Sequence, residues 1–337
     1  MNRVDDGPVD ERLPLVDATL TVPTPAVFCP FPPRVSPHLT AVQRYAVAWA
    51  TRHGFLPTSR QRAGFARARF ASLMSRAYPD ATYADLCLAV SWLTVTFVLD
   101  DYLETTLGRE PDRQRELADQ ILGLYAGGSR PDLVERPLAG ALSEVWTRTV
   151  ARTGPAWRQR FVGHVGEYLA ANVWEATNRR RGRVPPVYEY VRMRRHTAAT
   201  AMFFDLLEAL AGLPPEVHPL TEAGLALLRT HADNIVAWFN DLVSWPKEAA
   251  SGDPHNLVLV VRHELGLPIA EAVAHVVDRH DREVRAFIAA RDRYGSRLCA
   301  AAPVRRAVEG LQCWIRANVD WSRESGRYAP PGAGLEE

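Results

Sequence analysis

The sequence predicts an all-α protein, a single helical bundle around a central cavity. Three observations support this prediction. Apolar residues recur with a helical period of about 3.6 over most of the chain, strand-like alternation is scarce, and Pro and Gly gather between the periodic segments. A chain of 337 residues with 47% hydrophobic residues can bury a substantial core and is near the upper size for one domain. Ligand and metal sites of bundles form between facing helices, so a central cavity is expected.

The predicted helices follow one another along the chain, each with an apolar face and with Gly or Pro near its ends. In order, they span residues 39–53, 59–77, 82–106, 112–126, 134–152, 156–177, 186–212, 219–250, 254–289 and 302–325. Segment 178–183 falls between two of them, carries four arginines and precedes Pro185-Pro186. We interpret it as a solvated loop rather than a nucleic-acid patch, with a part in closing the cavity as the alternative.

Two terminal segments are predicted to lie outside the bundle. Segment 1–27 is acidic, contains proline and has no secretory signal pattern, and segment 329–337 begins with a Pro-Gly-rich stretch. We expect both to be flexible arms around a main domain of residues 28–328. No window approaches the length of charge-free apolar sequence that spans a bilayer, so we expect no membrane span and a cytoplasmic location.

Charge and cysteine content exclude further classes of protein. A formal net charge of +1 argues against a dedicated nucleic-acid binder. Cys29, Cys87, Cys299 and Cys313 lack the paired spacing of a zinc site, and we interpret them as reduced thiols. The residues also lack the Ser, His and Asp pattern of a hydrolase.

The helix predicted over 82–106 ends in a cluster of acidic residues. Residues 86–99 carry no charge, so this helix is expected to be buried on nearly all sides. At about 100° per residue, Phe97, Asp100, Asp101 and Glu104 fall on one face. Carboxylates at the end of a core helix need a partner, and such hard oxygen ligands suit Mg²⁺ or Mn²⁺.

A second polar cluster occupies residues 240–248. Asn240, Ser244 and Glu248 are spaced by four residues and therefore share a helix face. Their amide, hydroxyl and carboxylate oxygens could bind Mg²⁺, and water and a substrate phosphate would complete its coordination. Lys247 adds a positive charge directed to phosphate. Pro246 predicts a kink inside this motif.

These two clusters resemble the aspartate-rich and Asn-Ser-Glu motifs of the bacterial class I terpene synthases, most closely the sesquiterpene synthases. Segment 28–38 resembles the opening segment of that family, segment 190–197 its diphosphate-sensing helix, and Arg327-Tyr328 its terminal Arg-Tyr pair. The motifs occur in order over most of the chain, so their combination is far more specific than any one of them. Glu104 stands where many members have aspartate, and Ala198 where glycine is frequent, which bears on fine geometry and product rather than on reaction class.

The resemblance implies three Mg²⁺ ions, with Mn²⁺ as a substitute, around an isoprenoid diphosphate. The metal ligands would be Asp100, Asp101, Glu104, Asn240, Ser244 and Glu248. The diphosphate donors would be Arg194, Lys247, Arg327 and Tyr328. Thr197 and Ala198 would convey occupancy from Arg194 to a bend in the helix. The cavity wall is predicted to include Phe97, Phe203, Trp238, Trp314 and Trp321.

Some of these assignments have alternatives. Arg194 could instead form a salt bridge at a helix end, and Arg195 replaces it if the register is off by one. Trp314, Trp321 and Tyr328 are spaced by seven and would stack on one helix face, which is also the pattern of ordinary core packing. His196 is expected to be structural or to face solvent.

The activity that the resemblance implies is Mg²⁺-dependent ionisation and cyclisation of a linear isoprenoid diphosphate. Farnesyl diphosphate is the first choice, giving a cyclic sesquiterpene hydrocarbon or alcohol and free diphosphate, with geranyl and geranylgeranyl diphosphate as alternatives. Two other functions are less consistent with the sequence. A chain-elongating prenyltransferase normally carries two aspartate-rich motifs, whereas this chain has the Asn240, Ser244 and Glu248 set in place of the second. A non-catalytic isoprenoid-binding protein would not need a suitable residue at every metal and phosphate position, as this chain has. No side-chain base is evident, and both a monomer and a homodimer fit the composition.

Overall fold

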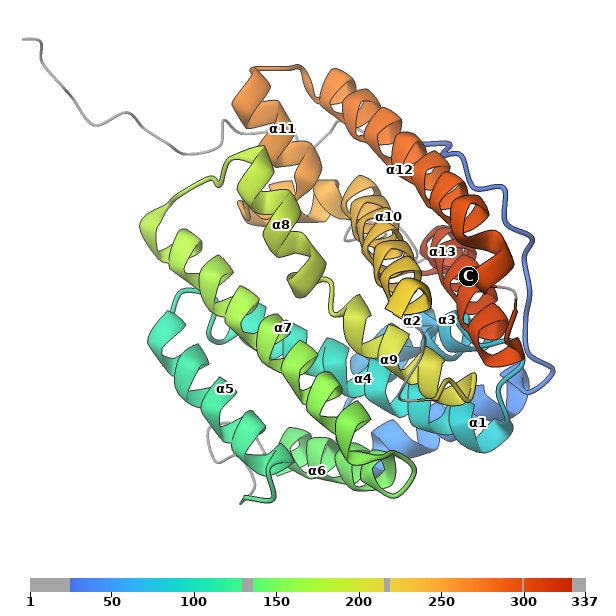
Figure 1. Cartoon of the computed structure of the whole chain (residues 1–337). Coiled ribbons are helices and arrows are strands. Elements are labelled where there is room, and N and C mark those ends of the chain that lie inside the picture. The colour runs from blue at the N-terminus through green and yellow to red at the C-terminus, as the bar shows by residue number, and fades with distance from the viewer. Residues whose placement is uncertain (1–24, 129–135, 215–218, 299, 329–337) are drawn as a thin grey trace, which may run out of the picture.

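The computed structural model describes residues 25–128, 136–214, 219–298 and 300–328, and all regular structure within these ranges is helical. The all-α prediction is therefore confirmed. Figure 1 shows the helices packed side by side in one bundle. In chain order they are α1 (Leu39–Arg52), α2 (Ser59–Ala68), α3 (Phe70–Ala77), α4 (Tyr83–Thr105), α5 (Pro111–Tyr125), α6 (Arg136–Val150), α7 (Pro155–Arg181), α8 (Val187–Thr197), α9 (Thr200–Leu210), α10 (Pro219–Ser251), α11 (Leu257–Leu265), α12 (Ile269–Leu298) and α13 (Ala302–Glu324).

Most of the two predicted arms lies outside the described residues. Only 25–27 of the first arm is described, and none of 329–337; Cys299 also lies outside. The domain limits of 28 and 328 therefore stay predictions.

Helix α4 is a core helix that carries the acidic cluster at its end. It begins after Thr82, whose hydroxyl accepts a hydrogen bond from the backbone N–H of Asp85 at 3.3 Å. Contrary to the sequence-based expectation, α4 is long and apolar enough to cross a membrane by length and composition alone. However, 67% of its most apolar window is buried inside the bundle, so it fits a packed core helix.

Helix α10 carries the second polar cluster on one uninterrupted element. Its 33 residues pack against α8, α9, α11, α12 and α13. Pro246 lies inside the helix, which continues to Ser251. Asn240, Ser244 and Glu248 therefore remain on one helix, as their spacing predicts.

Three of the predicted helices are each divided in two. Segment 59–77 breaks at Arg69 (φ 49°), segment 186–212 at Ala199 (φ 59°), and segment 254–289 at Gly266 (φ 63°). A left-handed residue redirects the chain and ends the helix, and only at Gly266 does the residue type favour it. The last of these segments resumes as α12 and runs on to Leu298.

The predicted loop 178–183 is wrong in its first part. Helix α7 runs to Arg181 and ends at Gly182, which has φ 67° and serves as its left-handed cap. The helix thus continues for one more turn than the predicted end at residue 177. As a result, Asn178 is buried and Arg179 lines the cavity inside the bundle.

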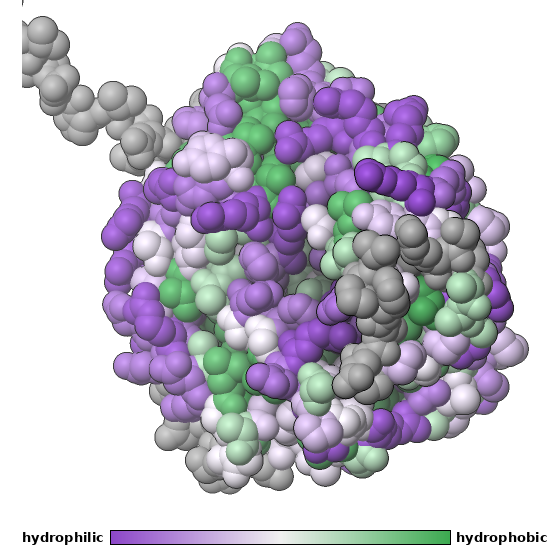
Figure 2. Space-filling view, viewed as in Figure 1, coloured by the Kyte–Doolittle hydropathy of each residue, from purple (hydrophilic) through white to green (hydrophobic). Residues whose placement is uncertain are grey.

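Buried apolar side chains form two clusters. One gathers residues mainly from α1, α3, α4, α5, α6, α7, α9, α10 and α13, and the other from α8, α10, α11 and α12. Helix α10 contributes to both, with Val236 in the first and Ala237 in the second. The face of the molecule shown in Figure 2 is mostly hydrophilic, with smaller hydrophobic patches.

Candidate active site

A cavity opens at the centre of the bundle between α4, α7, α8, α9, α10 and α13. One part of its lining is polar and charged, with Asp100, Arg194, Asn240 and Glu248 among its members. Another part is apolar and aromatic, with side chains from α3, α4, α9 and α13. The apolar lining comprises Leu73, Leu93, Phe97, Ala198, Ala199, Phe203, Val236, Ala237, Trp314 and Trp321.

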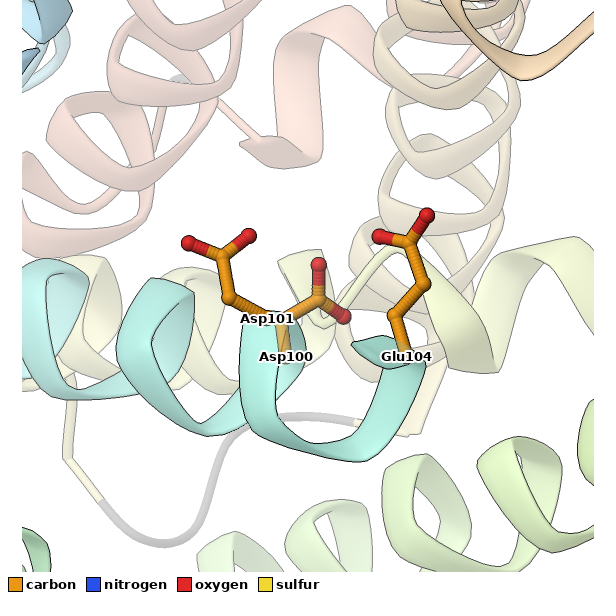
Figure 3. Close-up of side chains that lie close together, drawn as sticks. All are labelled: Asp100, Asp101 and Glu104. Carbon is orange, nitrogen blue, oxygen red and sulfur yellow. The ribbon is translucent and has the colours of Figure 1, made fainter. Parts of the chain in front are cut away.

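The acidic cluster forms as the sequence predicts. Asp100, Asp101 and Glu104 each offer an oxygen atom, and these atoms lie within 4.8 Å of one another. Figure 3 shows the three side chains projecting from the last turns of α4 toward the same side. Burial, opposed by Arg327 and reinforced by Asp101, raises the pKa of Asp100 to about 6. Because like charges this close repel one another, the cluster fits a divalent cation held by hard oxygen ligands.

The second cluster is arranged around Asn256, the N-cap residue of α11. Asn256 Nδ2 lies 2.5 Å from Glu248 Oε2, 2.9 Å from the backbone oxygen of Asp241 and 3.4 Å from Ser244 Oγ. Burial, reinforced by Asp241, raises the pKa of Glu248 to about 8. Asn240 and Glu248 line the cavity, whereas Ser244 is buried beside Asn256. The amide, hydroxyl and carboxylate oxygens again fit a magnesium site.

Arg194, rather than Arg195, lies at the cavity. Arg194 Nε donates to Asp241 Oδ1 at 2.9 Å, its Nη2 to Asn240 Oδ1 at 2.8 Å, and its Nη1 to Thr197 Oγ1 at 3.2 Å. The salt-bridge alternative is thus also realised, with a buried partner rather than at the surface. Arg195 Nε instead donates to Asn234 Oδ1 at 2.9 Å, away from the lining.

Asp241 lies inside the second motif but is turned into the protein. Its side chain is fully buried and accepts from Tyr190 OH at 2.9 Å and from the backbone N–H of Leu257 at 3.0 Å, in addition to Arg194. This carboxylate therefore anchors α8 and the start of α11 to α10.

The C-terminal Arg-Tyr pair links the two clusters. Arg327 Nη2 donates to Asp101 Oδ1 at 3.0 Å, and its guanidinium carbon lies 4.2 Å from the ring centre of Phe97. Tyr328 OH accepts from Asn240 Nδ2 at 2.6 Å. At the edge of the same site, Lys247 Nζ lies 3.7 Å from Glu104 Oε2. All four predicted donors thus meet a predicted metal ligand.

The predicted aromatic wall is mostly in place. Phe97, Phe203, Trp314 and Trp321 line the cavity. Helix α13 ends at Glu324, so Tyr328 is not on the helix, yet its ring meets Trp321 edge-on with centroids 5.7 Å apart.

The prediction that Trp238 belongs to the cavity wall is wrong, because this residue does not line the cavity. Its ring packs in the second core cluster, 4.9 Å from the guanidinium carbon of Arg279. Trp238 precedes Asn240 by two residues and so points roughly 200° away from it around α10.

The chain bends at the cavity where α8 gives way to α9. Thr197 is the last residue of α8, Ala198 caps it, and Ala199 is left-handed. Residues 197–200 all line the cavity. His196, next to this bend, is partly exposed and lies 3.3 Å from Glu167 Oε2, consistent with a solvent-facing role.

One charged face of the cavity was missed by the sequence analysis. Tyr168, Asn172, Glu175 and Arg179 lie on α7 at the spacing of a single helix face and line the cavity. Tyr168 OH donates to Asp100 Oδ1 at 3.2 Å. Arg179 donates to Glu175 Oε2 at 2.7 Å and to Asp253 at 2.9 Å. The sequence signal that could have identified this face is the spacing of the four residues by four, three and four positions. The pattern was not recognised because the helix was predicted to end before Arg179.

Comparison with known proteins gives a consistent result. Residues 91–286 match the family described as terpene synthase family 2, C-terminal metal binding. The chain is 36% identical to a (+)-T-muurolol synthase of Roseiflexus castenholzii that cyclises (2E,6E)-farnesyl diphosphate, over 89% of this chain and 92% of that protein. It is 34% identical to the 10-epi-cubebol synthase of Sorangium cellulosum, over 91% of this chain and 99% of that protein.

A solved structure is similar along nearly its whole length. The crystal structure of the germacradien-4-ol synthase from Streptomyces citricolor superposes with a TM-score of 0.77 at 26% identity. The match covers 88% of this chain and 98% of that one.

Proposed function

The chain belongs to the bacterial class I terpene synthases, and from this premise we propose that it cyclises farnesyl diphosphate to a sesquiterpene hydrocarbon or alcohol with release of diphosphate. One observation carries this proposal: two oxygen-rich clusters and four phosphate donors meet beside a cavity whose remaining wall is aromatic. Two relatives are named as enzymes that cyclise (2E,6E)-farnesyl diphosphate, which supports a substrate of this chain length. Geranyl and geranylgeranyl diphosphate are the alternatives.

We further propose that the two clusters hold three Mg²⁺ ions. The ligands would be Asp100, Asp101, Glu104, Asn240, Ser244 and Glu248, and the carboxylate, amide and hydroxyl oxygens of this set fit Mg²⁺. When bound, Mg²⁺ supplies positive charge that stabilises the departing diphosphate.

The residues of the chain divide the remaining work. Arg194, Lys247, Arg327 and Tyr328 donate to the diphosphate oxygens and hold them at the polar end of the cavity. The aromatic rings of Trp314 and Trp321 attract the allylic cation without offering a lone pair that would capture it. The Phe97 ring contributes apolar lining, since Arg327 lies over it and Phe70 stacks on it. The apolar lining excludes water while the chain folds into a ring.

The proposal predicts which product forms from which substrate. Purified protein is incubated with geranyl, farnesyl and geranylgeranyl diphosphate, each with Mg²⁺ or with EDTA, and the organic extract is analysed by gas chromatography with mass spectrometry. We expect a cyclic C15 product from farnesyl diphosphate with Mg²⁺ and none with EDTA. Longer prenyl diphosphates on addition of isopentenyl diphosphate would instead assign the chain to the elongating enzymes, and bound substrate without turnover to the binding proteins.

A second prediction concerns pH. Asp100 and Glu248 have pKa values raised to about 6 and about 8, so both hold protons at lower pH and must lose them to bind metal. The affinity for Mg²⁺ is therefore expected to rise with pH from 6 to 8, with proton release on binding. Isothermal titration calorimetry in two buffers of different ionisation enthalpy measures both. Equal affinity at pH 6 and pH 8 would contradict this assignment of ligands.

The cytoplasmic location and the absence of nucleic-acid partners stay predictions from the sequence. Cys29, Cys87 and Cys313 are free thiols, which supports the location that we propose.

A further inference from the structure

Thr200 is a hydroxyl-bearing residue of the cavity lining that is not one of the proposed diphosphate donors. It is the first residue of α9, directly after the left-handed residue Ala199, and it lines the cavity together with Ala199 and Phe203. The residue is only 4% exposed. Its Oγ1 donates a hydrogen bond to Asp233 Oδ1 at 2.5 Å. A cavity hydroxyl is thus backed by a carboxylate.

Asp233 lies behind Thr200 on the inner face of α10. Asp233, Ala237 and Asn240 are spaced by four and three residues, so they share one helix face. Ala237 and Asn240 line the cavity, whereas Asp233 does not line it and is connected to it by the hydrogen bond from Thr200. Seven residues of helix separate Asp233 from Asn240, about 10 Å along α10. The Thr200–Asp233 pair therefore serves a region of the cavity remote from the metal-ligand clusters.

The charged groups that face Asp233 leave its carboxylate able to take up a proton. They are Arg229 on α10, His164 on α7 and Arg195 on α8. Each also has another partner: Arg229 and His164 bond to Asp205, and Arg195 bonds to Asn234. Burial raises the pKa of Asp233 to about 6, so above this pH the carboxylate is ionised and a strong acceptor. The residue itself is partly exposed, which gives the acquired proton a way out to water.

We propose that Thr200 and Asp233 together accept the proton that is lost in the last step of cyclisation. This inference rests on the proposed function and deepens it, since the sequence motifs include no evident side-chain base. Thr200 is the catalytic residue of this proposal because it lines the cavity, and Asp233 acts through it.

The step balances without any further reagent. A C–H bond beside the cationic carbon breaks, and its electron pair becomes the new C=C bond. The proton goes to Thr200 Oγ1, while the hydroxyl proton of Thr200 passes to Asp233 Oδ1 along the existing hydrogen bond. If water adds to the cation first, the same pair takes one proton from the bound water. Neutral Asp233 then returns its proton to solvent before the next turnover.

The position of the pair distinguishes it from the leaving group as a base. Diphosphate oxygens held near Asn240 would serve carbons at the polar end of the cavity. Asp233, the partner of Thr200, is separated from Asn240 by about 10 Å of helical rise along α10, so the pair would remove protons from carbons away from the diphosphate. The pair therefore decides which alkene forms rather than whether ionisation occurs.

Three variants test this, Thr200→Val, Thr200→Ser and Asp233→Asn, with diphosphate release and product composition as separate readouts. Diphosphate release reports ionisation, which precedes the proton loss, and it is measured for each variant as the reference for its product composition. The share of the main product is expected to fall at least tenfold in T200V and D233N, in favour of alkenes deprotonated near the ionised end. T200S keeps the hydroxyl and is expected to keep the main product.

The pH profile separates proton transfer from packing. The product ratio of the unchanged protein is expected to move toward the D233N pattern as the pH falls below about 6, the pKa of Asp233, and that of D233N to stay constant. An unchanged product distribution in T200V, or T200S products matching those of T200V, would overturn the inference. Absence of diphosphate release from the unchanged protein would instead refute the proposed function.

Discussion

Replacing Asn240 with alanine is expected to reduce Mg²⁺-dependent diphosphate release on the order of 10³-fold, the scale seen when an oriented group that stabilises transition-state charge is removed. Asn240 occupies the centre of the polar end: its Oδ1 accepts from Arg194 and its Nδ2 donates to Tyr328. Asn240→Ala removes a proposed metal ligand and both of these contacts at once. Release of diphosphate from farnesyl diphosphate at saturating Mg²⁺ measures the effect.

Two matched variants show whether the loss is local. Asn240→Asp keeps an oxygen ligand at the same position and is expected to retain measurable activity. Asp278→Asn changes an exposed carboxylate of α12, paired with Arg282, and is expected to leave activity unchanged. Full turnover in Asn240→Ala would remove Asn240 from the metal site.

Replacing Arg194 with methionine is expected to lower both activity and stability. Asp241 would lose its cationic partner while staying fully buried, and an uncompensated buried charge costs roughly 3–5 kcal/mol of unfolding free energy. The bonds from Tyr190 and the backbone of Leu257 remain, so we expect a loss of about 3 kcal/mol. Activity should fall by about 10²-fold or more, because a proposed diphosphate donor is gone. Denaturant unfolding and diphosphate release measure the two effects separately.

A double variant separates these two roles of Arg194. Adding Asp241→Asn to Arg194→Met removes the unpaired charge and keeps an acceptor for Tyr190, so most of the lost stability is expected to return. Activity is expected to stay low, since the diphosphate donor is still missing. Recovery of activity along with stability would show that Arg194 acts only by holding Asp241.

The sequence predicted the helices and both polar clusters because these depend on local spacing. Asp100, Asp101 and Glu104 come together within one turn and a half of a single helix, and Asn240 and Glu248 within little more than two turns of another. No long-range information is needed to place such side chains on a common face. Pairing of the clusters with Arg327 and Tyr328 followed from the family resemblance, and the contacts with Asp101 and Asn240 agree with it.

Local spacing did not predict the breaks at Arg69 and Ala199, although the family resemblance implied a bend in the helix beside Thr197 and Ala198. Arg69 and Ala199 adopt a left-handed backbone conformation that their side chains disfavour, so tertiary packing rather than residue type imposes it. Pairs that join distant segments were equally hidden. Thr200 and Asp233 lie 33 positions apart, and Asn256 reaches Glu248 only because the chain turns back after α10.

Three cations near the acidic and amide clusters lie against oxygen-bearing residues of those clusters. Asp101 holds Arg327, Glu104 faces Lys247, and the amide oxygen of Asn240 is taken by Arg194. The groups proposed to receive metal are therefore paired with the groups proposed to receive diphosphate. Releasing Asp101 for a metal frees Arg327 for diphosphate, and the reverse holds equally. We therefore expect metal and diphosphate binding to be thermodynamically linked, with each ligand raising the affinity for the other by the same factor.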